Sequence, residues 1–230
     1  MSEPVGGIIV AGGKGLRMGA SIPKQYIEIG GKPILQRTME ALLSYDHSSR
    51  WVVVVPEGDV ERVKEMVSVS GFSHRMMVTM GGKSRGESVF NGLKALPHEV
   101  ERVAIHDGVR PFVSRSLLQR LFEEDAPSVV PIVPSVDSLR RYTPSGSEAV
   151  DRNLYVRVQT PQVIERKLLE EAYDILARNH FEGAFTDDVS LVESLCGVSP
   201  SMVEGEETNI KITHKMDLAL AEYILNRYQM

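Results

Sequence analysis

Three lysine and arginine side chains surround a glycine-rich segment near the N-terminus, a combination suited to binding a polyphosphate. Residues 10–18 are Val-Ala-Gly-Gly-Lys-Gly-Leu-Arg-Met and include Lys14 and Arg17, and Lys24 follows in the segment Pro-Lys-Gln-Tyr. Glycines let the backbone approach phosphate oxygens, with its N–H groups pointing inward. The preceding apolar run predicts that this loop leaves the carboxyl end of a first strand, where open α/β sheets bind ligands. The three cations can offset the negative charge of a phosphoryl transition state.

Two common phosphate-binding patterns are excluded. The Walker pattern requires Ser or Thr after its Gly-Lys pair, and neither pair, at residues 13–14 or 31–32, has one. The dinucleotide fingerprint begins correctly at Gly13 and Gly15 but has Met18 at its third glycine position. A tight glycine turn with solvated lysines is the alternative to a phosphate loop.

A second glycine cluster occupies residues 81–88, Gly-Gly-Lys-Ser-Arg-Gly-Glu-Ser, between an expected strand and an expected helix. Unpaired N–H groups at a helix N-terminus attract anions, and Arg85 and Ser88 add a guanidinium and a hydroxyl donor. This pattern predicts an anion or nucleobase site, and a simply capped helix start is the alternative.

A third cluster, residues 106–111, follows an expected strand and contains Asp107 and Arg110. A carboxylate beside a triphosphate suggests a divalent cation between them, such as Mg²⁺ at Asp107. His106 is expected to be packed inside the fold, because adjacent strand residues point to opposite faces and a His–Asp relay is then disfavoured. Arg110 could bind a substrate phosphate or hydroxyl, or it could simply pair with Asp107.

Composition limits the classes of protein to consider. The chain has 230 residues, 42% of them hydrophobic, and a net charge of −5, which argues against nucleic acid as the ligand and favours a small anion. Its single cysteine, Cys196, excludes an internal disulfide and fits a cytoplasmic location. No segment has the length of a membrane span or the pattern of a signal peptide.

Short β-branched runs alternate with amphipathic segments, which predicts a mostly parallel, doubly wound α/β sheet in a single domain over residues 1–230. The expected strands, all placed in the middle of the sheet, are Gly7–Val10, Trp51–Val55, Met76–Met80, Val103–His106 and Val129–Val133. The expected helices are Ile34–Leu43, Val60–Val69, Arg85–Ala95, Arg115–Glu124, Arg166–Arg178, Val189–Leu195 and Lys215–Tyr228. The pair Asp187 and Asp188 suits the N-terminus of the sixth helix.

Residues 135–157 break this alternation and predict a protruding β-hairpin arm, with strands at Leu139–Tyr142 and Ala149–Arg157 around a turn at Pro144–Ser147. An isolated hairpin is marginally stable in water, so a second protomer is expected to support it. A flexible surface excursion is the alternative.

Taken together, these motifs closely resemble those of the 2-C-methyl-D-erythritol 4-phosphate cytidylyltransferases over residues 6–225. The matching segments are 11–18, 23–25, 81–85, 106–111, 160–162, 186–187 and 209–213. The resemblance implies a nucleotidyltransferase fold and a homodimer formed through the arm. It also implies transfer of CMP from CTP to methylerythritol phosphate, with release of pyrophosphate, in non-mevalonate isoprenoid synthesis.

The resemblance also assigns roles by position. The implied catalytic residues are Arg17, Lys24 and Lys211. The implied nucleotide-binding residues are Ala11, Gly12, Gly13, Lys14, Gly15, Gly82, Arg85 and Ser88. The implied substrate-binding residues are Asp107, Arg110, Ser138, Arg152, Thr160, Thr186 and Lys211. The family commonly has Thr where Ser138 stands, so that contact keeps its hydroxyl and loses a methyl group.

Two other functions stay open from the sequence. A cytidylyltransferase for another polyol phosphate, such as ribitol 5-phosphate, would have nearly the same nucleotide loops and would differ in the arm. A non-catalytic regulator that senses CTP would need only the first two glycine clusters, which leaves Lys24, Asp107, Thr186 and Lys211 without a common purpose.

Overall fold

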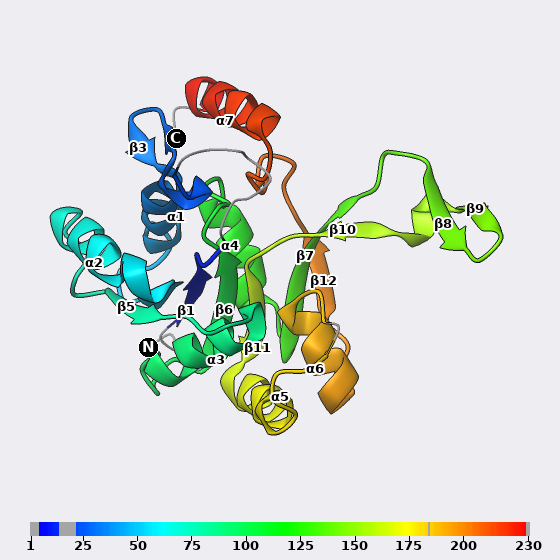
Figure 1. Ribbon diagram of the computed structural model, residues 1–230, viewed down its shortest axis with the longest axis horizontal. Coiled ribbons are helices and arrows are strands. Elements are labelled where there is room, and N and C mark those ends of the chain that lie inside the picture. The colour runs from blue at the N-terminus through cyan, green and yellow to red at the C-terminus, as the bar shows by residue number, and fades with distance from the viewer. Residues whose placement is uncertain (1–4, 14–21, 184, 229–230) are drawn as a thin grey trace.

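The computed structural model describes residues 5–13, 22–183 and 185–228, and a mixed, mostly parallel sheet runs through its centre (Figure 1). In spatial order the strands are β10 (Val156–Val158), β7 (Ser128–Pro134), β11 (Gln162–Glu165), β6 (Arg102–Asp107), β1 (Val5–Val10), β4 (Arg50–Val55) and β5 (Met76–Met80), while β12 (Ser201–Glu204) pairs with β7. Strands β6, β1, β4 and β5 pair in parallel, and so do β7 and β12.

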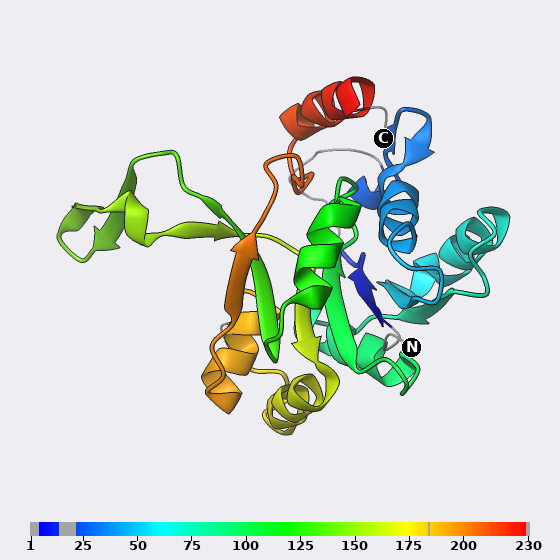
Figure 2. The ribbon, with the colours of Figure 1, turned by 180° about the vertical axis from the view of Figure 1, so that it is seen from behind.

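Helices cover both faces of this sheet (Figure 1), as the view from behind also shows (Figure 2). One apolar core joins Ile9 of β1 to α1 (Ile34–Leu43), α2 (Val60–Val69) and α4 (Arg115–Glu123). The other core joins Ile8 to α3 (Arg85–Ala95), α5 (Arg166–Arg178) and α6 (Asp188–Cys196). Consecutive residues of a strand point to opposite faces, so the uninterrupted apolar run of β1 supplies both cores.

This arrangement confirms the predicted α/β fold and most of the predicted elements. One expectation was wrong, because β5 lies at an edge of the sheet instead of in its middle. Its Met77 and Met80 side chains are accordingly 42% and 54% exposed. Sequence reasoning also missed β11, which runs antiparallel between β6 and β7.

The parallel strands bring three loops to one edge of the sheet. Strand β1 lies between β4 and β6, with Val10 opposite both Val54 and Asp107. Strand β5 lies beyond β4 and ends at Met80. The three clusters singled out in the sequence therefore leave the sheet at the same edge, which is where open α/β sheets bind ligands.

The segment 135–157 contains an antiparallel hairpin that extends away from the sheet, drawn in green in Figure 1. Its strands are β8 (Leu139–Thr143) and β9 (Gly146–Val150). The second strand ends earlier than predicted, since the short helix η4 (Arg152–Leu154) interrupts the chain before β10 joins the main sheet.

A third apolar cluster lies beside the loop-bearing edge and includes α7 (Lys215–Tyr228). Ile224 and Leu225 of α7 pack with Ile29 of the small hairpin formed by β2 (Glu28–Ile29) and β3 (Lys32–Pro33). This cluster ties the chain that follows Lys24 to the C-terminal segment. Within the described part of the chain, no helix combines the length and apolarity that a bilayer span requires.

Candidate active site

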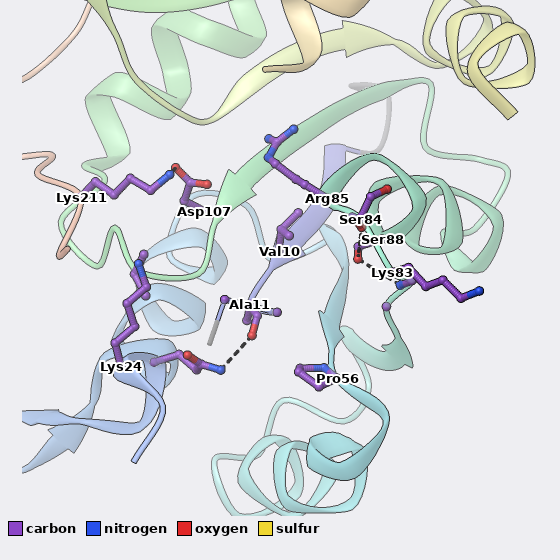
Figure 3. A pocket seen from close by; sticks show the side chains of 16 residues that line it. Val10, Ala11, Lys24, Pro56, Lys83, Ser84, Arg85, Ser88, Asp107 and Lys211 are labelled. Carbon is purple, nitrogen blue, oxygen red and sulfur yellow. Dashed lines mark hydrogen bonds and ion pairs between the residues drawn. The ribbon is translucent and has the colours of Figure 1, made fainter. Parts of the chain in front are cut away.

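A cavity of about 690 Å³ opens at the carboxyl ends of the parallel strands, and the side chains in Figure 3 approach it from several directions. The lining residues are Val10, Ala11, Gly12, Gly13, Lys24, Gln25, Pro56, Gly81, Gly82, Lys83, Ser84, Arg85, Ser88, Asp107, Val109 and Lys211. This wall contains each candidate nucleotide-binding or catalytic residue that falls in the described part of the chain. Lys14, Gly15 and Arg17 lie outside the described residues.

Gln25 joins the first glycine loop to the short helix η2 (Lys24–Tyr26), which carries Lys24. Its buried amide donates to the carbonyl of Ala11 at 3.0 Å, and the N–H of Ala11 donates to the carbonyl of Val54 at 2.9 Å. Lys24 Nζ lies 3.4 Å from the carbonyl oxygen of Ile212, next to Lys211 in the sequence. These contacts hold two candidate catalytic lysines and a backbone loop around one cavity.

The second glycine cluster is both a capped helix start and part of the cavity wall, so its two interpretations are compatible. Ser84 is the N-cap of α3, and its hydroxyl accepts from the N–H of Glu87 at 3.0 Å. Ser88 Oγ donates to the carbonyl of Ser84 at 2.8 Å and accepts from the N–H of Gly82 at 3.0 Å. A Cβ at Gly82 would come within 2.2 Å of the Glu87 side chain, so this tight turn requires glycine.

Asp107 is paired with two cations from different parts of the chain. Its Oδ2 lies 3.0 Å from Lys211 Nζ and 3.3 Å from Arg110 Nε, so the simple Asp107–Arg110 pair considered from the sequence is present. Burial opposes ionisation of this carboxyl, but Lys211 and Arg110 hold its pKa at about 2. Arg110 Nη1 also donates to the carbonyl of Asn209 at 2.8 Å, which fixes the segment that carries Lys211.

His106 lies inside the fold, as predicted, and fixes the hydroxyl of Thr160. The ring is 0% exposed, and burial lowers its pKa to about 4, so it is neutral near pH 7. Nε2 lies 3.0 Å from the carbonyl of Arg110, which can only accept, so Nε2 carries the proton. Nδ1 then accepts from the Thr160 hydroxyl at 3.0 Å, and that oxygen in turn accepts from the Asp107 N–H at 3.1 Å. No His–Asp relay forms.

A second, smaller cavity of about 130 Å³ adjoins this group. Its lining residues are Arg85, Asp107, Arg110, Val158, Gln159, Thr160, Gln162, Thr186, Asp187 and Lys211. The linings of the two cavities share Arg85, Asp107 and Lys211. We call these three residues the shared wall.

Two candidate substrate-binding residues of the arm lie in neither lining. Ser138 is exposed just before β8, and Arg152 is exposed in η4, where its Nη1 donates to the carbonyl of Val136 at 2.6 Å. The arm thus directs both side chains to solvent within this chain.

Sequence reasoning missed several buried residues that position the site. Gln25 belongs to a matched motif, but only its contact with Ala11 reveals a role. Asn209 Nδ2 donates to the carbonyl of Thr160 at 2.9 Å and so joins two matched segments. Asp188 was expected only as a helix-start acid, whereas its carboxylate forms an ion pair with Arg85.

Comparison with known proteins identifies the family. The family model described as 2-C-methyl-D-erythritol 4-phosphate cytidylyltransferase matches residues 5–227. A protein of that name from Bacteroides fragilis is 45% identical over 220 residues, covering 95% of this chain and 98% of its own. One from Syntrophus aciditrophicus is 37% identical over 238 residues, covering 99% and 98%.

Solved structures agree with this assignment. The 4-diphosphocytidyl-2C-methyl-D-erythritol synthase of Anaerococcus prevotii superposes with a TM-score of 0.84 at 29% identity, covering 98% of this chain and 97% of its own. The 2-C-methyl-D-erythritol 4-phosphate cytidylyltransferase of Thermus thermophilus gives 0.76 at 29% identity, covering 97% and 99%. The match of the family model over nearly the whole chain, together with these relatives, shows that the chain belongs to the 2-C-methyl-D-erythritol 4-phosphate cytidylyltransferase family.

Proposed function

We propose that this protein transfers CMP from CTP to 2-C-methyl-D-erythritol 4-phosphate and releases pyrophosphate. The observation that carries the proposal is the pair of adjoining cavities with one shared wall of charged residues. One cavity has the size and glycine-rich lining suited to a nucleoside triphosphate. The other is lined by Arg110, Thr160 and Lys211, whose donors suit the phosphate and hydroxyl groups of a phosphorylated polyol. Family membership supports the identity of both substrates.

The larger cavity is proposed to hold CTP. Backbone N–H groups of Gly12 and Gly13 would face its phosphates, and Gly82, Ser88 and the start of α3 would hold the cytidine. Lys14, Gly15 and Arg17 are proposed to complete this nucleotide site from outside the described residues.

The smaller cavity is proposed to hold the acceptor. Arg110, Thr160 and Thr186 line it, and Lys211 and Asp107 stand where it meets the nucleotide cavity. An oxygen of the acceptor phosphate would attack the α-phosphorus of CTP in line, and the bond from that phosphorus to pyrophosphate would break. A phosphate is largely ionised near pH 7, so no general base is required.

Repulsion between two anionic reactants is then the main obstacle to transfer. Arg17, Lys24 and Lys211 are proposed to lower it and to hold the reactants in line, since positioning and charge stabilisation provide most of the catalysis of phosphoryl transfer. Among the described residues, Lys24 and Lys211 reach the same cavity from opposite ends of the chain.

A divalent cation such as Mg²⁺ is proposed at Asp107. No group of three or more His, Cys, Asp or Glu residues that could hold a metal occurs among the described residues. Mg²⁺ commonly uses one or two carboxylates together with substrate phosphates, so a single carboxylate in the shared wall fits this mode. The bound cation would neutralise phosphate charge.

The hairpin arm is proposed to bind a second copy of the chain. Tyr142 and Leu154 are 94% and 80% exposed, which leaves apolar surface along the arm for a partner to cover. Ser138 and Arg152 lie in neither cavity of their own chain, so they are proposed to reach the acceptor site of the partner in a homodimer.

The test is an assay of pyrophosphate release from CTP. Release should require an acceptor, and 2-C-methyl-D-erythritol 4-phosphate should support it far better than ribitol 5-phosphate under identical conditions. A preference for ribitol 5-phosphate would overturn the proposed substrate. CTP binding without release in the presence of either acceptor would indicate a nucleotide sensor instead of an enzyme.

A further inference from the structure

Asp188 is a fully buried carboxylate that adjoins the candidate active site and has none of the roles proposed above. It is the first residue of α6, and its Oδ2 lies 2.5 Å from Arg85 Nη2. Its Oδ1 accepts from the Tyr173 hydroxyl at 2.6 Å. Both carboxylate oxygens therefore have a partner, as a buried charge requires.

The backbone of Asp188 is also fixed. Gln162, buried in β11, accepts from the N–H groups of Asp188 and Val189 through Oε1, at 2.9 and 3.1 Å. The N-terminus of α6 additionally favours a negative charge at this position. Buried ion pairs often contribute little net stability, because desolvation offsets the attraction. A well-anchored carboxylate can instead hold its partner in one orientation.

The partner, Arg85, belongs to the shared wall of the two cavities. Its side chain is 35% exposed, and Figure 3 shows its guanidinium on the same side of the larger cavity as Asp107 and Lys211. The charge of Asp188 raises the pKa of Arg85, and the guanidinium is charged at any physiological pH. A guanidinium has five N–H donors, so the contact through Nη2 leaves others for a ligand.

We propose that Asp188 and Tyr173 are positioning residues that hold the Arg85 guanidinium at the shared wall, where it contacts the phosphates of both reactants as they meet. The inference rests on the proposed function and goes beyond it, since it separates Arg85 from the residues that only bind nucleotide. In the proposed nucleotide site the backbone of the glycine loops would hold the CTP phosphates, and the Arg85 side chain would add a contact that matters most when the two reactants meet. Misplacing Arg85 should therefore lower kcat far more than it raises the KM for CTP.

The experiment measures steady-state kinetics with each substrate varied in turn. Asp188→Asn keeps the size of the side chain and removes its charge. We expect kcat to fall by about 10- to 100-fold, the range known for residues that orient metal ligands through a hydrogen bond, with the KM for CTP changed by less than about threefold. A variant with lowered thermal stability and wild-type kcat would show that the pair only supports the fold, and would overturn the proposal.

A double-mutant cycle tests whether Asp188 acts through Arg85. Arg85→Ala should lower kcat at least as much as Asp188→Asn, and the double variant should be no slower than Arg85→Ala. A double variant slower by the product of the two single effects would overturn the proposal. Arg166→Lys is the matched control, since this buried arginine of α5 bonds to carbonyls near the opposite end of β6. It should lower stability without changing either KM or kcat.

Tyr173→Phe provides a milder variant if Asp188→Asn does not fold. The ring would still stack near Phe90, at a centroid distance of 6.3 Å, while Asp188 would lose one hydrogen-bond donor. We expect kcat to fall several-fold with an unchanged KM for CTP, and an unchanged kcat would overturn the proposal. An inactive wild-type protein would instead refute the proposed function, and this inference with it.

Discussion

Replacing His106 should change how the stability of this protein depends on pH. The ordinary pKa of histidine is 6.5, and burial lowers that of His106 to about 4. Above about pH 6.5 the ring is neutral in both the folded and the unfolded chain. As the pH falls below that value, the unfolded chain takes up a proton that the folded chain does not. The folded state therefore loses stability until about pH 4.

The magnitude follows from the two pKa values. Each pKa unit corresponds to about 1.4 kcal/mol, so His106 should reduce the free energy of unfolding by about 2 kcal/mol between pH 7.5 and 5. The full loss, reached near pH 4, is about 3 kcal/mol.

His106→Asn removes this titration. Its amide oxygen can replace Nδ1 as the acceptor of the Thr160 hydroxyl, but the carbonyl of Arg110 loses its donor. The variant should thus be about 1–3 kcal/mol less stable at pH 7.5. This difference in unfolding free energy should shrink by about 2 kcal/mol at pH 5, because only the wild type is penalised there.

Urea unfolding at pH 7.5, 6 and 5 measures these free energies, with a constant m-value as the check on two-state behaviour. His98→Asn is the matched control, because it makes the same substitution at an exposed histidine and leaves the buried His106 ring and its hydrogen bonds in place. The reasoning would be refuted by a gap between wild type and His106→Asn that stays the same from pH 7.5 to 5.

Three further outcomes follow from the site and its support. Lys24→Ala should lower kcat by about 10²–10³ while changing CTP affinity much less, whereas Lys64→Ala, on the exposed face of α2, should match the wild type in the same assays. Lys211→Met should lower kcat/KM for the acceptor by about 10²–10³. Because Lys211 lowers the pKa of Asp107, a carboxyl NMR titration of this variant should show that pKa raised above about 2. Gly92→Ala should lower the free energy of unfolding by about 1–3 kcal/mol, because the new Cβ would lie 2.6 Å from a side-chain carbon of Ile8 in β1. Urea unfolding measures this change, and unchanged stability would contradict the packing.

The helices and most strands could be predicted because each buries a periodic set of apolar residues. The bounds of α1, α2, α3 and α5 agree with those expected from spacing alone. β11 escaped prediction for a physical reason, since it is four residues long and adjoins the start of α5 without a break. Its antiparallel pairing with β6 and β7 depends on partners far away in the sequence, which local periodicity cannot reveal.

The site was predictable where a loop follows a strand and carries charge. Ala11 and Gly82 lie in such loops, Asp107 ends the strand before a third, and all three residues line one cavity. The residues that orient these groups were not predictable, because their partners are distant. Asp188 is 103 positions from Arg85, and nothing in its local sequence distinguishes a helix-start acid from half of a buried ion pair.

One physical reason explains why two carboxylates, Asp107 and Asp188, lie in a site proposed to bind anions. Arg85, Arg110 and Lys211 would repel one another if they were gathered without compensation, and the repulsion would spread them apart before a substrate arrived. Asp188 pairs with the first, and Asp107 pairs with the other two. The cations are thereby held in place in advance, so that little reorganisation is needed when phosphates enter. On this view the two acids differ in what they control. Asp107, in the shared wall, would act where the proposed substrates meet, whereas Asp188, fully buried, would act only through the arginine that it contacts.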